Sequence, residues 1–406
     1  AKAGRERERE GNKLRFLSKM RTATAATAIG RGQAPCHASA LARTLASPPQ
    51  RGHADVSLRE KSRTVRMRMR MRRLVVKARA SAEEKIDPTT GLPISDSDVV
   101  KKATVEINGT TWSYRYTVGE SKKPTVVLLH GALSSSYSYR RVIDLLGRAG
   151  YDVVVPDWPG HGDSGVPAAG KFAFKADDYV HGLSAFLYKV IGKEKKFVLA
   201  TQGFILGQYG MLYALRNADL IEKLVIFNTP LEAKTPLPGI LQKVKGSEGG
   251  LFGFNNPFAK SDQGPLESVE AANYMQGGSP YFLDRDDAET YQDPFYDQAK
   301  RDAAQSMMKN VNYEELLKTL DEGFQRWRVE SLVAFGTSDY YVDWETAIEW
   351  LDDKRTCMKF YTFADKMGHT VQDDYPERVA ELLQNFCEGN DIQKKSSLKR
   401  TGDFTE

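Results

Sequence analysis

The sequence has little cysteine: Cys36, Cys357 and Cys387 are the only three in 406 residues. Cysteines scattered in this way form no disulfide framework, and they lack the spacing of a metal site. This usage favours a reducing compartment. The sequence also has no apolar run of the ~18 residues that a membrane-spanning helix needs, so we expect no transmembrane segment.

Histidine is scarce as well, with six residues in the whole chain, and His369 is the only histidine after His181. Acidic residues are scarce at the start of the chain. Residues 1–80 contain 21 Lys and Arg but 5 Asp and Glu, whereas residues 81–406 contain 37 and 48. The net charge of +5 therefore combines a basic leader with an acidic body.

The leader, residues 1–80, is rich in Arg, Ala, Ser and Thr, as organelle transit peptides are. Its end, MRMRMRRLVVKARAS at residues 67–81, resembles the end of a chloroplast transit peptide of the green-algal type. We therefore expect a chloroplast protein, located in the stroma or associated peripherally with the thylakoid. The alternative is a disordered basic tail that binds nucleic acid or anionic lipid. We favour targeting and expect no nucleic-acid partner.

Strand patterns and helix patterns alternate after a polar linker at residues 81–100. Alternating residues around Asn108-Gly109 predict a β-hairpin. Apolar runs, typical of strands that are buried on both faces, follow at 125–129, 197–200, 224–227 and 332–335, and further strand patterns follow at 151–157 and 358–363. The alternation predicts an α/β fold with a doubly wound, mostly parallel sheet.

Residues 231–330 interrupt this alternation. They contain Pro and Gly early and polar helical sequence afterwards, so we interpret them as an inserted, mainly helical cap. The core then comprises residues 101–230 and 331–387, and residues 388–406 form a polar tail.

Five motifs carry a family resemblance. They are His130-Gly131, the loop from Asp157 to Ser164, the strand-to-helix segment FVLATQGFILG at 197–207, Gly336 with Asp339, and Gly368-His369. In this order and spacing they resemble the α/β-hydrolase superfamily over about 125–387. Within it, the chain resembles the capped branch of epoxide hydrolases and haloalkane dehalogenases. It is most similar to plastid-targeted plant and algal proteins with a Gln-Gly-Phe segment at the strand-to-helix turn.

The resemblance implies that the strand-to-helix turn after residue 197 is the elbow that carries the nucleophile. Gln202 stands at the nucleophile position, and residues 197–210 contain no Ser, Cys, Asp or Glu and a single aliphatic hydroxyl, that of Thr201. A carboxamide is not nucleophilic at neutral pH, so we expect no covalent ester intermediate. Gln202 could instead donate a hydrogen bond to a bound carbonyl or position a water molecule.

The resemblance also assigns the rest of the catalytic set. Asp339 falls at the position of the acid and His369 at that of the base, in the family's chain order. The chemistry agrees, because an imidazole acts as a base near neutral pH and needs a carboxylate to hold its tautomer. Ala132 and Gly203 would supply the two oxyanion-hole amides.

Two activities of the capped branch can be compared with the sequence. Haloalkane dehalogenases have a halide-binding Asn at the position of Ala132 and a Trp after an Asp nucleophile. This chain has neither of these halide-binding residues, so we do not expect dehalogenation. Epoxide hydrolases use cap tyrosines to protonate the leaving oxygen. Tyr281, Tyr291 and Tyr296 are candidates for such a substrate-binding role, although most cap tyrosines only pack.

Three functions remain open. The first is a hydrolase, or another His–Asp acid/base enzyme, that acts without a covalent step on a small apolar ester- or epoxide-like compound. The second is a non-catalytic protein that binds an apolar ligand between core and cap, and the third is a scaffold that docks on another plastid protein. We rank the enzyme first, leave the oligomeric state open, and expect no metal and no organic cofactor.

Overall fold

The computed structural model describes residues 99–392 except for 121, 233, 247–284, 353–356 and 364–366. The basic leader, most of the linker, Tyr281 and the end of the tail lie outside these residues. Within them, every helix is too short or too polar to cross a bilayer.

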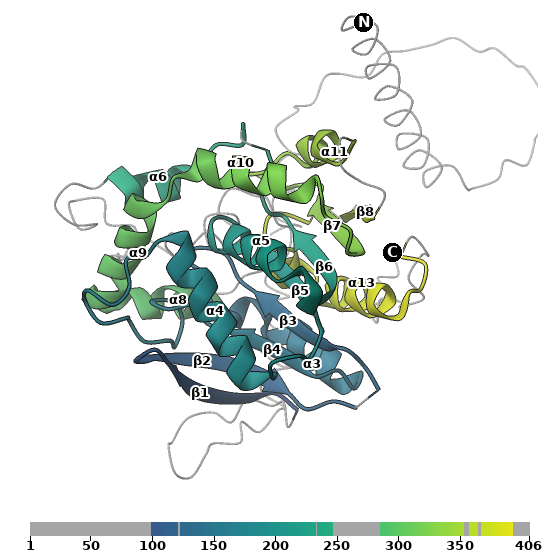
Figure 1. The fold of residues 1–406 in the computed structure, drawn as a ribbon, viewed down its shortest axis with the longest axis horizontal. Coiled ribbons are helices and arrows are strands. Elements are labelled where there is room, and N and C mark those ends of the chain that lie inside the picture. The colour runs from purple at the N-terminus through teal and green to yellow at the C-terminus, as the bar shows by residue number, and fades with distance from the viewer. Residues whose placement is uncertain are drawn as a thin grey trace, which may run out of the picture. The chain divides into compact units, whose positions relative to one another are not determined.

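Eight strands of the described chain form one sheet in the order β1-β2-β4-β3-β5-β6-β7-β8 (Figure 1). The first two, β1 (Lys101–Ile107) and β2 (Thr110–Thr117), form the expected hairpin. Asn108 and Gly109 both have positive φ in its turn, as a two-residue hairpin loop requires. Strand β2 pairs antiparallel with β4, and all later pairs are parallel. The predicted doubly wound, mostly parallel sheet is confirmed.

The remaining strands follow the apolar runs closely. They are β3 (Thr125–Leu129), β4 (Val153–Pro156), β5 (Phe197–Gln202), β6 (Ile221–Phe227), β7 (Ser331–Gly336) and β8 (Met358–Phe363). Strand β5 continues two residues beyond its apolar run because Thr201 and Gln202 still pair with Ile226 and Phe227 of β6. Backbone pairing therefore extends the strand into polar residues, which hydrophobicity alone does not reveal.

Helices cover both faces of this sheet (Figure 1). The helices α3 (Arg140–Arg148) and α13 (Pro376–Glu388) pack on one face, and α4 (Ala176–Val190), α5 (Leu206–Arg216) and α11 (Trp344–Asp352) pack on the other. Each face of the sheet has its own hydrophobic cluster, and alternate residues of β3 point into the two clusters. Val126 and Leu128 belong to one cluster, and Val127 and Leu129 belong to the other. The short helices are η1 (Ser136–Tyr139), η2 (Ala218–Leu220) and α12 (Val371–Asp374).

The described part of residues 231–330 contributes helices and no strand. These helices are α6 (Gly239–Gly246), α8 (Arg285–Gln292), η3 (Asp293–Tyr296), α9 (Gln298–Asn310) and α10 (Tyr313–Phe324). Helix α9 lies against the loop after β4, where Lys300 donates to the Gly162 carbonyl and Asn310 donates to the Ala173 carbonyl. The described part of the predicted cap is therefore helical, and the residue bounds of the individual domains stay predictions.

Candidate active site

The predicted acid and base lie in contact at the carboxyl end of the sheet. Asp339 follows β7, and His369 lies in the loop between β8 and α12. The Nδ1 atom of His369 is 3.0 Å from Oδ2 of Asp339, and the two side chains are 1% and 0% exposed. Because an ionised carboxylate only accepts hydrogen bonds, Nδ1 carries the proton and Nε2 is the basic nitrogen. The structure thus brings these two predicted residues together in the arrangement of a base and its orienting acid.

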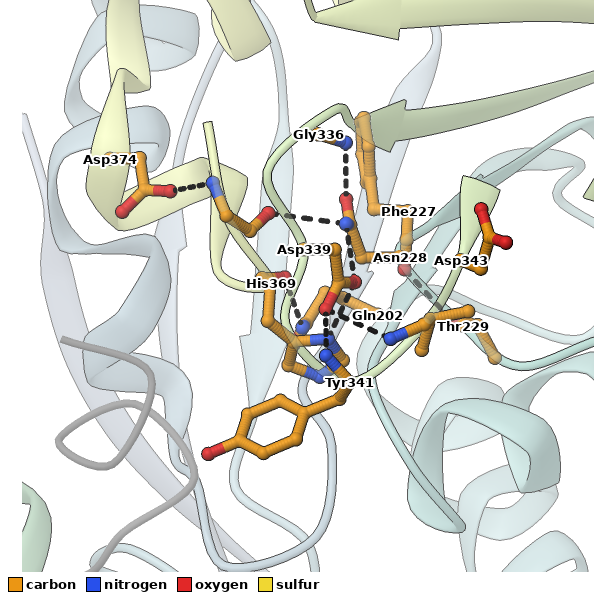
Figure 2. A network of polar contacts seen from close by, with 12 residues as sticks. Gln202, Phe227, Asn228, Thr229, Gly336, Asp339, Tyr341, Asp343, His369 and Asp374 are labelled. Atoms are coloured by element: carbon orange, nitrogen blue, oxygen red, sulfur yellow. Dashed lines mark hydrogen bonds and ion pairs between the residues drawn. The ribbon is translucent and has the colours of Figure 1, made fainter. Parts of the chain in front are cut away.

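Three further donors fix the Asp339 carboxylate. Its Oδ1 accepts hydrogen bonds from the backbone amides of Tyr341, at 2.8 Å, and Val342, at 3.1 Å. Its Oδ2, which faces the imidazole, also accepts a hydrogen bond of 2.8 Å from Nδ2 of Asn228 (Figure 2). A buried carboxylate needs such donors to remain in place, and here they leave it one orientation toward the imidazole.

Asn228 is a site residue that the sequence reasoning missed. It is fully buried directly after β6, and its side chain joins three segments (Figure 2). Besides Asp339, its Nδ2 donates to the Gly368 carbonyl at 3.1 Å, and its Oδ1 accepts from the Gly336 amide at 3.2 Å. Its position could have indicated a site residue, because Asn228 is a polar residue at the carboxyl end of a buried strand. Asp339 likewise follows the neighbouring strand, β7.

At the elbow, Gly203 rather than Gln202 faces the imidazole. Gly203 has φ +84°, and a Cβ built on it would lie 3.8 Å from Nε2 of His369. Gln202 still belongs to β5, and its carboxamide donates to the backbone carbonyl of His369 at 3.0 Å and accepts from Gln372 at 3.4 Å. The elbow residue that faces the base thus has no side chain, and the assignment of Gln202 to the nucleophile position stays a prediction.

The hydroxyl of Thr201, next to Gln202 in the sequence, already makes a hydrogen bond within the elbow. Thr201 is fully buried, and its Oγ1 donates a hydrogen bond of 2.6 Å to the carbonyl of Gly207 at the start of α5. This bond closes the strand-to-helix turn from inside. The Thr201 hydroxyl thus stabilises the backbone of the elbow.

The backbone amide of Ala132, predicted to form part of an oxyanion hole, also makes a hydrogen bond within the chain. It donates to the carbonyl of Phe204 at 3.0 Å, and the same carbonyl accepts from the Leu206 amide at 2.7 Å. The second bond spans Ile205, whose φ of 59° and ψ of −69° give a rare and strained γ-turn. The Gln208 side chain stabilises this turn by accepting from the Ile205 amide and donating to the Pro230 carbonyl.

Two aromatic rings contact the imidazole. The ring centroid of Phe204 lies 5.3 Å from that of His369, and the ring of Tyr341 meets it edge-on at the same distance. Phe204 is buried. Tyr341 also lines a groove of about 480 Å³ beside the Asp339 loop, together with Tyr340, Trp344 and the segment that enters the cap. The base therefore has two aromatic rings against its imidazole.

The described cap tyrosines have different environments. Tyr291 is buried, and its hydroxyl donates to Asp373 at 2.5 Å. Tyr296 is half-buried, and its carbonyl accepts from Arg301. Tyr281, the third candidate, lies outside the described residues. A substrate-binding role stays a prediction for all three, as do the catalytic roles of Asp339 and His369.

A metal centre is not apparent. Within the described ranges, no group of three or more His, Cys, Asp or Glu side chains is arranged to hold a metal ion. The two buried histidines near the site are engaged as neutral groups. Burial lowers the pKa of His130 to about 4 and that of His161 to about 3. His130 accepts a hydrogen bond from the Trp158 amide, and His161 packs against the cap residue Phe295.

Comparisons with known proteins agree with this architecture. Residues 124–376 match the family model described as alpha/beta hydrolase fold. A cis-3-alkyl-4-alkyloxetan-2-one decarboxylase of Shewanella oneidensis is 24% identical over 66% of this chain and 83% of its own. A haloalkane dehalogenase of Psychrobacter cryohalolentis is 23% identical over 65% of this chain and 84% of its own. The crystal structure of a haloalkane dehalogenase from Bradyrhizobium elkani superposes with a TM-score of 0.58 at 19% identity, over 71% of this chain and 98% of that one.

Proposed function

Because the chain belongs to the α/β-hydrolase fold family, we propose that it is a chloroplast His–Asp acid/base enzyme that works without a covalent intermediate. Its substrate would be a small, apolar, ester- or epoxide-like compound. The names of two relatives support this class, since an alkyl-substituted oxetanone and a haloalkane are both small and mostly apolar. The relatives are too distant to define the reaction, so the proposal depends on the site.

The observation that carries the proposal is the orientation of His369. Its Nδ1 is held by a carboxylate with four hydrogen-bond donors, and its Nε2 faces the backbone of Gly203. At the point where a nucleophilic side chain would stand, Gly203 has none. A water molecule or a substrate oxygen near this backbone could therefore exchange a proton with Nε2.

The proposed reaction requires no group from the elbow. In hydrolysis, Nε2 of His369 takes a proton from water while the water oxygen forms a bond to the ester or epoxide carbon. At an ester carbon, the carbonyl π electrons move to the carbonyl oxygen and return as the C–O bond of the leaving oxygen breaks. At an epoxide carbon, the ring C–O bond breaks as the new bond forms. In both cases the imidazolium returns the proton to the leaving oxygen. Asp339 stabilises the imidazolium in between. The apolar rings of Phe204 and Tyr341 would strengthen this electrostatic effect by excluding water.

Turnover of a substrate panel tests the proposal. The panel should contain short-chain nitrophenyl esters, aryl and alkyl epoxides and alkyl-substituted β-lactones. For any substrate that the full chain converts, His369→Ala and Asp339→Asn should each reduce turnover on the order of 10³-fold or more. His181→Ala, at an exposed histidine, is the matched control and should leave turnover unchanged. Undiminished turnover in His369→Ala would reject the proposal.

The absence of a covalent step can be tested separately. Intact-mass spectrometry of the protein, quenched during turnover of an ester, should show the unmodified mass. A serine esterase with a slow deacylation step would accumulate an acyl adduct under the same conditions. An acyl adduct on any residue between 197 and 210 would contradict the proposed mechanism.

A ligand-binding protein or scaffold without turnover is the second candidate. One observation favours it: the Ala132 amide, which would stabilise an oxyanion, is bonded to the Phe204 carbonyl. Native mass spectrometry of protein isolated from plastids should then reveal a bound small molecule, or pull-downs should retrieve a stoichiometric partner. Conversion of a panel substrate that depends on His369 would exclude this alternative.

The chloroplast location is a proposal supported by the basic composition of residues 1–80. A fusion of residues 1–80 to a fluorescent protein should enter chloroplasts of a green alga and lose its leader there. The same fusion with the Arg residues of 67–73 changed to Glu is the control and should stay outside. Extraction of the endogenous protein from isolated thylakoids with salt would distinguish peripheral attachment from a stromal location.

A further inference from the structure

A mostly buried arginine connects the cap to the short helix that follows His369. Arg140, the first residue of α3, lies between Asp373 of α12 and Asp287 of the cap helix α8. Its Nη1 is 2.5 Å from Asp373, and its Nη2 is 3.0 Å from Asp287. The side chains of Arg140, Asp373 and Asp287 are 15%, 7% and 12% exposed. Water and salt therefore screen these ion pairs much less than they screen pairs on the surface.

Two tyrosines complete this cluster. The Tyr137 hydroxyl donates to Oδ1 of Asp287 at 2.7 Å, and the Tyr291 hydroxyl donates to Oδ2 of Asp373 at 2.5 Å. The guanidinium of Arg140 lies 4.2 Å from the centroid of the Tyr137 ring, a cation–π contact. Each of the four carboxylate oxygens thus has a donor, as buried charges require. We call these five residues the arginine clasp.

The clasp is tied to the loop of His369 through a few bonds. The backbone amides of Asp373 and Asp374 both donate to the Thr370 carbonyl, at 2.9 and 3.0 Å. The Asp374 carboxylate in turn accepts from the Gly368 amide, on the other side of His369. His369 therefore lies inside a small hydrogen-bonded segment whose far end is held by Arg140. A displacement of Asp373 would be transmitted to the imidazole through this segment.

We propose that Arg140 is a positioning residue that couples the packing of cap helix α8 against the core to the orientation of His369. The cluster contains one positive and two negative charges. Without Arg140, the carboxylates of Asp287 and Asp373 would lose the cation that they share, and removing one partner of a largely buried ion pair is strongly unfavourable. One carboxylate belongs to the cap and the other to the core, so their repulsion would separate α8 from the core and pull on α12. The proposed function enters only through the role of His369 as the base.

The experiment uses the full chain and measures the coupling without any substrate. Arg140→Gln removes the charge, Arg140→Lys keeps a charge without the forked geometry, and Arg141→Gln is the control at the exposed neighbouring residue. The first readout is the rate of limited proteolysis within the cap. The second is the position of the His369 ring-nitrogen signals in ¹⁵N NMR spectra, assigned by comparison with His369→Gln.

We expect Arg140→Gln to accelerate cleavage within the cap about tenfold or more and to shift the His369 signals. Arg140→Lys should have a partial effect on both, and Arg141→Gln should affect neither. Loosening of the cap with unmoved His369 signals would overturn the coupling, and so would a result identical to that of Arg141→Gln. If Arg140→Gln does not fold, Tyr291→Phe, which deletes one clasp hydroxyl, provides the same two readouts. Neither result depends on turnover, so failure here is distinguishable from failure of the proposed function.

Discussion

A Cβ atom built on Gly203 would lie 3.8 Å from Nε2 of His369, so the base faces a position that has no side chain. The sequence places the nucleophile position at Gln202, one residue before the residue that faces the base. This geometry suggests a direct experiment, because a hydroxyl introduced at residue 203 would come within reach of the imidazole.

Gly203→Ser should therefore create a reactive serine. We expect it to react with a fluorophosphonate probe, whereas the natural chain should not react at the elbow. The serine would adopt φ near +84° and would need a small shift of Gly131, so the free energy of unfolding should fall by about 1–3 kcal/mol. Labelling is measured by gel fluorescence and located by peptide mass spectrometry.

Two matched variants control this experiment. Gln202→Ser should remain unlabelled, since the side chain of residue 202 is directed toward the His369 carbonyl. Gly203→Ser combined with His369→Ala should lose the labelling, because the serine would have no base. Labelling of Gln202→Ser but not of Gly203→Ser would return the nucleophile position to residue 202. An adduct on Thr201 of the natural chain would contradict the inert elbow altogether.

Asn228→Ala should weaken both the fold and the site. It removes three hydrogen bonds, to Asp339, Gly368 and Gly336, and leaves their partners buried. We expect a loss of about 1–3 kcal/mol in the free energy of unfolding, measured in urea. Turnover of any accepted substrate should fall roughly tenfold to a hundredfold, as it does when groups that orient a functional ligand are removed. Thr229→Ala is the control, because its hydroxyl bonds only the Phe227 carbonyl; its turnover should be preserved.

Gly336→Ala should displace the loop that precedes His369. A Cβ on Gly336 would lie 2.3 Å from the carbonyl oxygen of Met367 and 2.4 Å from that of Gly368. Backbone atoms cannot rotate away, so we expect a loss of several kcal/mol, about 2–4, and a large fall in turnover. Gly239→Ala is the matched control, since a Cβ there has nothing within 4 Å. Equal urea midpoints for the two variants would show that the close approach at Gly336 is not present.

Acid should destabilise the protein through its buried histidines. Burial lowers the pKa of His130 to about 4 and that of His161 to about 3, from 6.5. Between pH 6.5 and about 4, the unfolded chain therefore binds more protons than the folded chain, and stability falls as the pH falls. The contribution of His130 alone is on the order of 3 kcal/mol.

Urea unfolding between pH 7.5 and 4.5 measures this effect. His161→Phe cannot be protonated and should reduce the loss of stability toward low pH, whereas His181→Gln, at an exposed position, should not. Burial also raises the pKa of Asp157, which acts in the opposite direction as the pH rises above 3.8. A stability that does not change between pH 6.5 and 4.5 in the natural chain would refute the prediction.

The sequence predicts the fold well because the buried strands of a parallel sheet are continuous apolar runs. The apolar run at 125–129 coincides with β3, whose five residues are all buried, and the strand pattern at 358–363 coincides with the edge strand β8. The sequence also places Asp339 and His369 at strand ends, where the sheet brings them together.

Other parts of the site depend on tertiary contacts that leave no periodic signal. The role of Asn228 arises from three segments that are distant in the chain. The choice between Gln202 and Gly203 depends on how far β5 continues pairing with β6, and pairing depends on the partner strand as much as on the sequence of β5. The engagement of Ala132 depends on the unusual turn at Ile205, which no residue preference predicts for a β-branched side chain.

The Ala132 amide already donates a hydrogen bond to the Phe204 carbonyl, so a ligand must compete with that carbonyl for the amide. A ligand carbonyl can use the Ala132 amide only after displacing an acceptor that is already in place. A net hydrogen bond in water is worth about 0.5–1.5 kcal/mol, so the apparent dissociation constant for such ligands is raised roughly two- to tenfold. Compounds that bind through their apolar surface avoid this penalty, and they should bind more tightly than polar analogues of equal size that need the Ala132 amide.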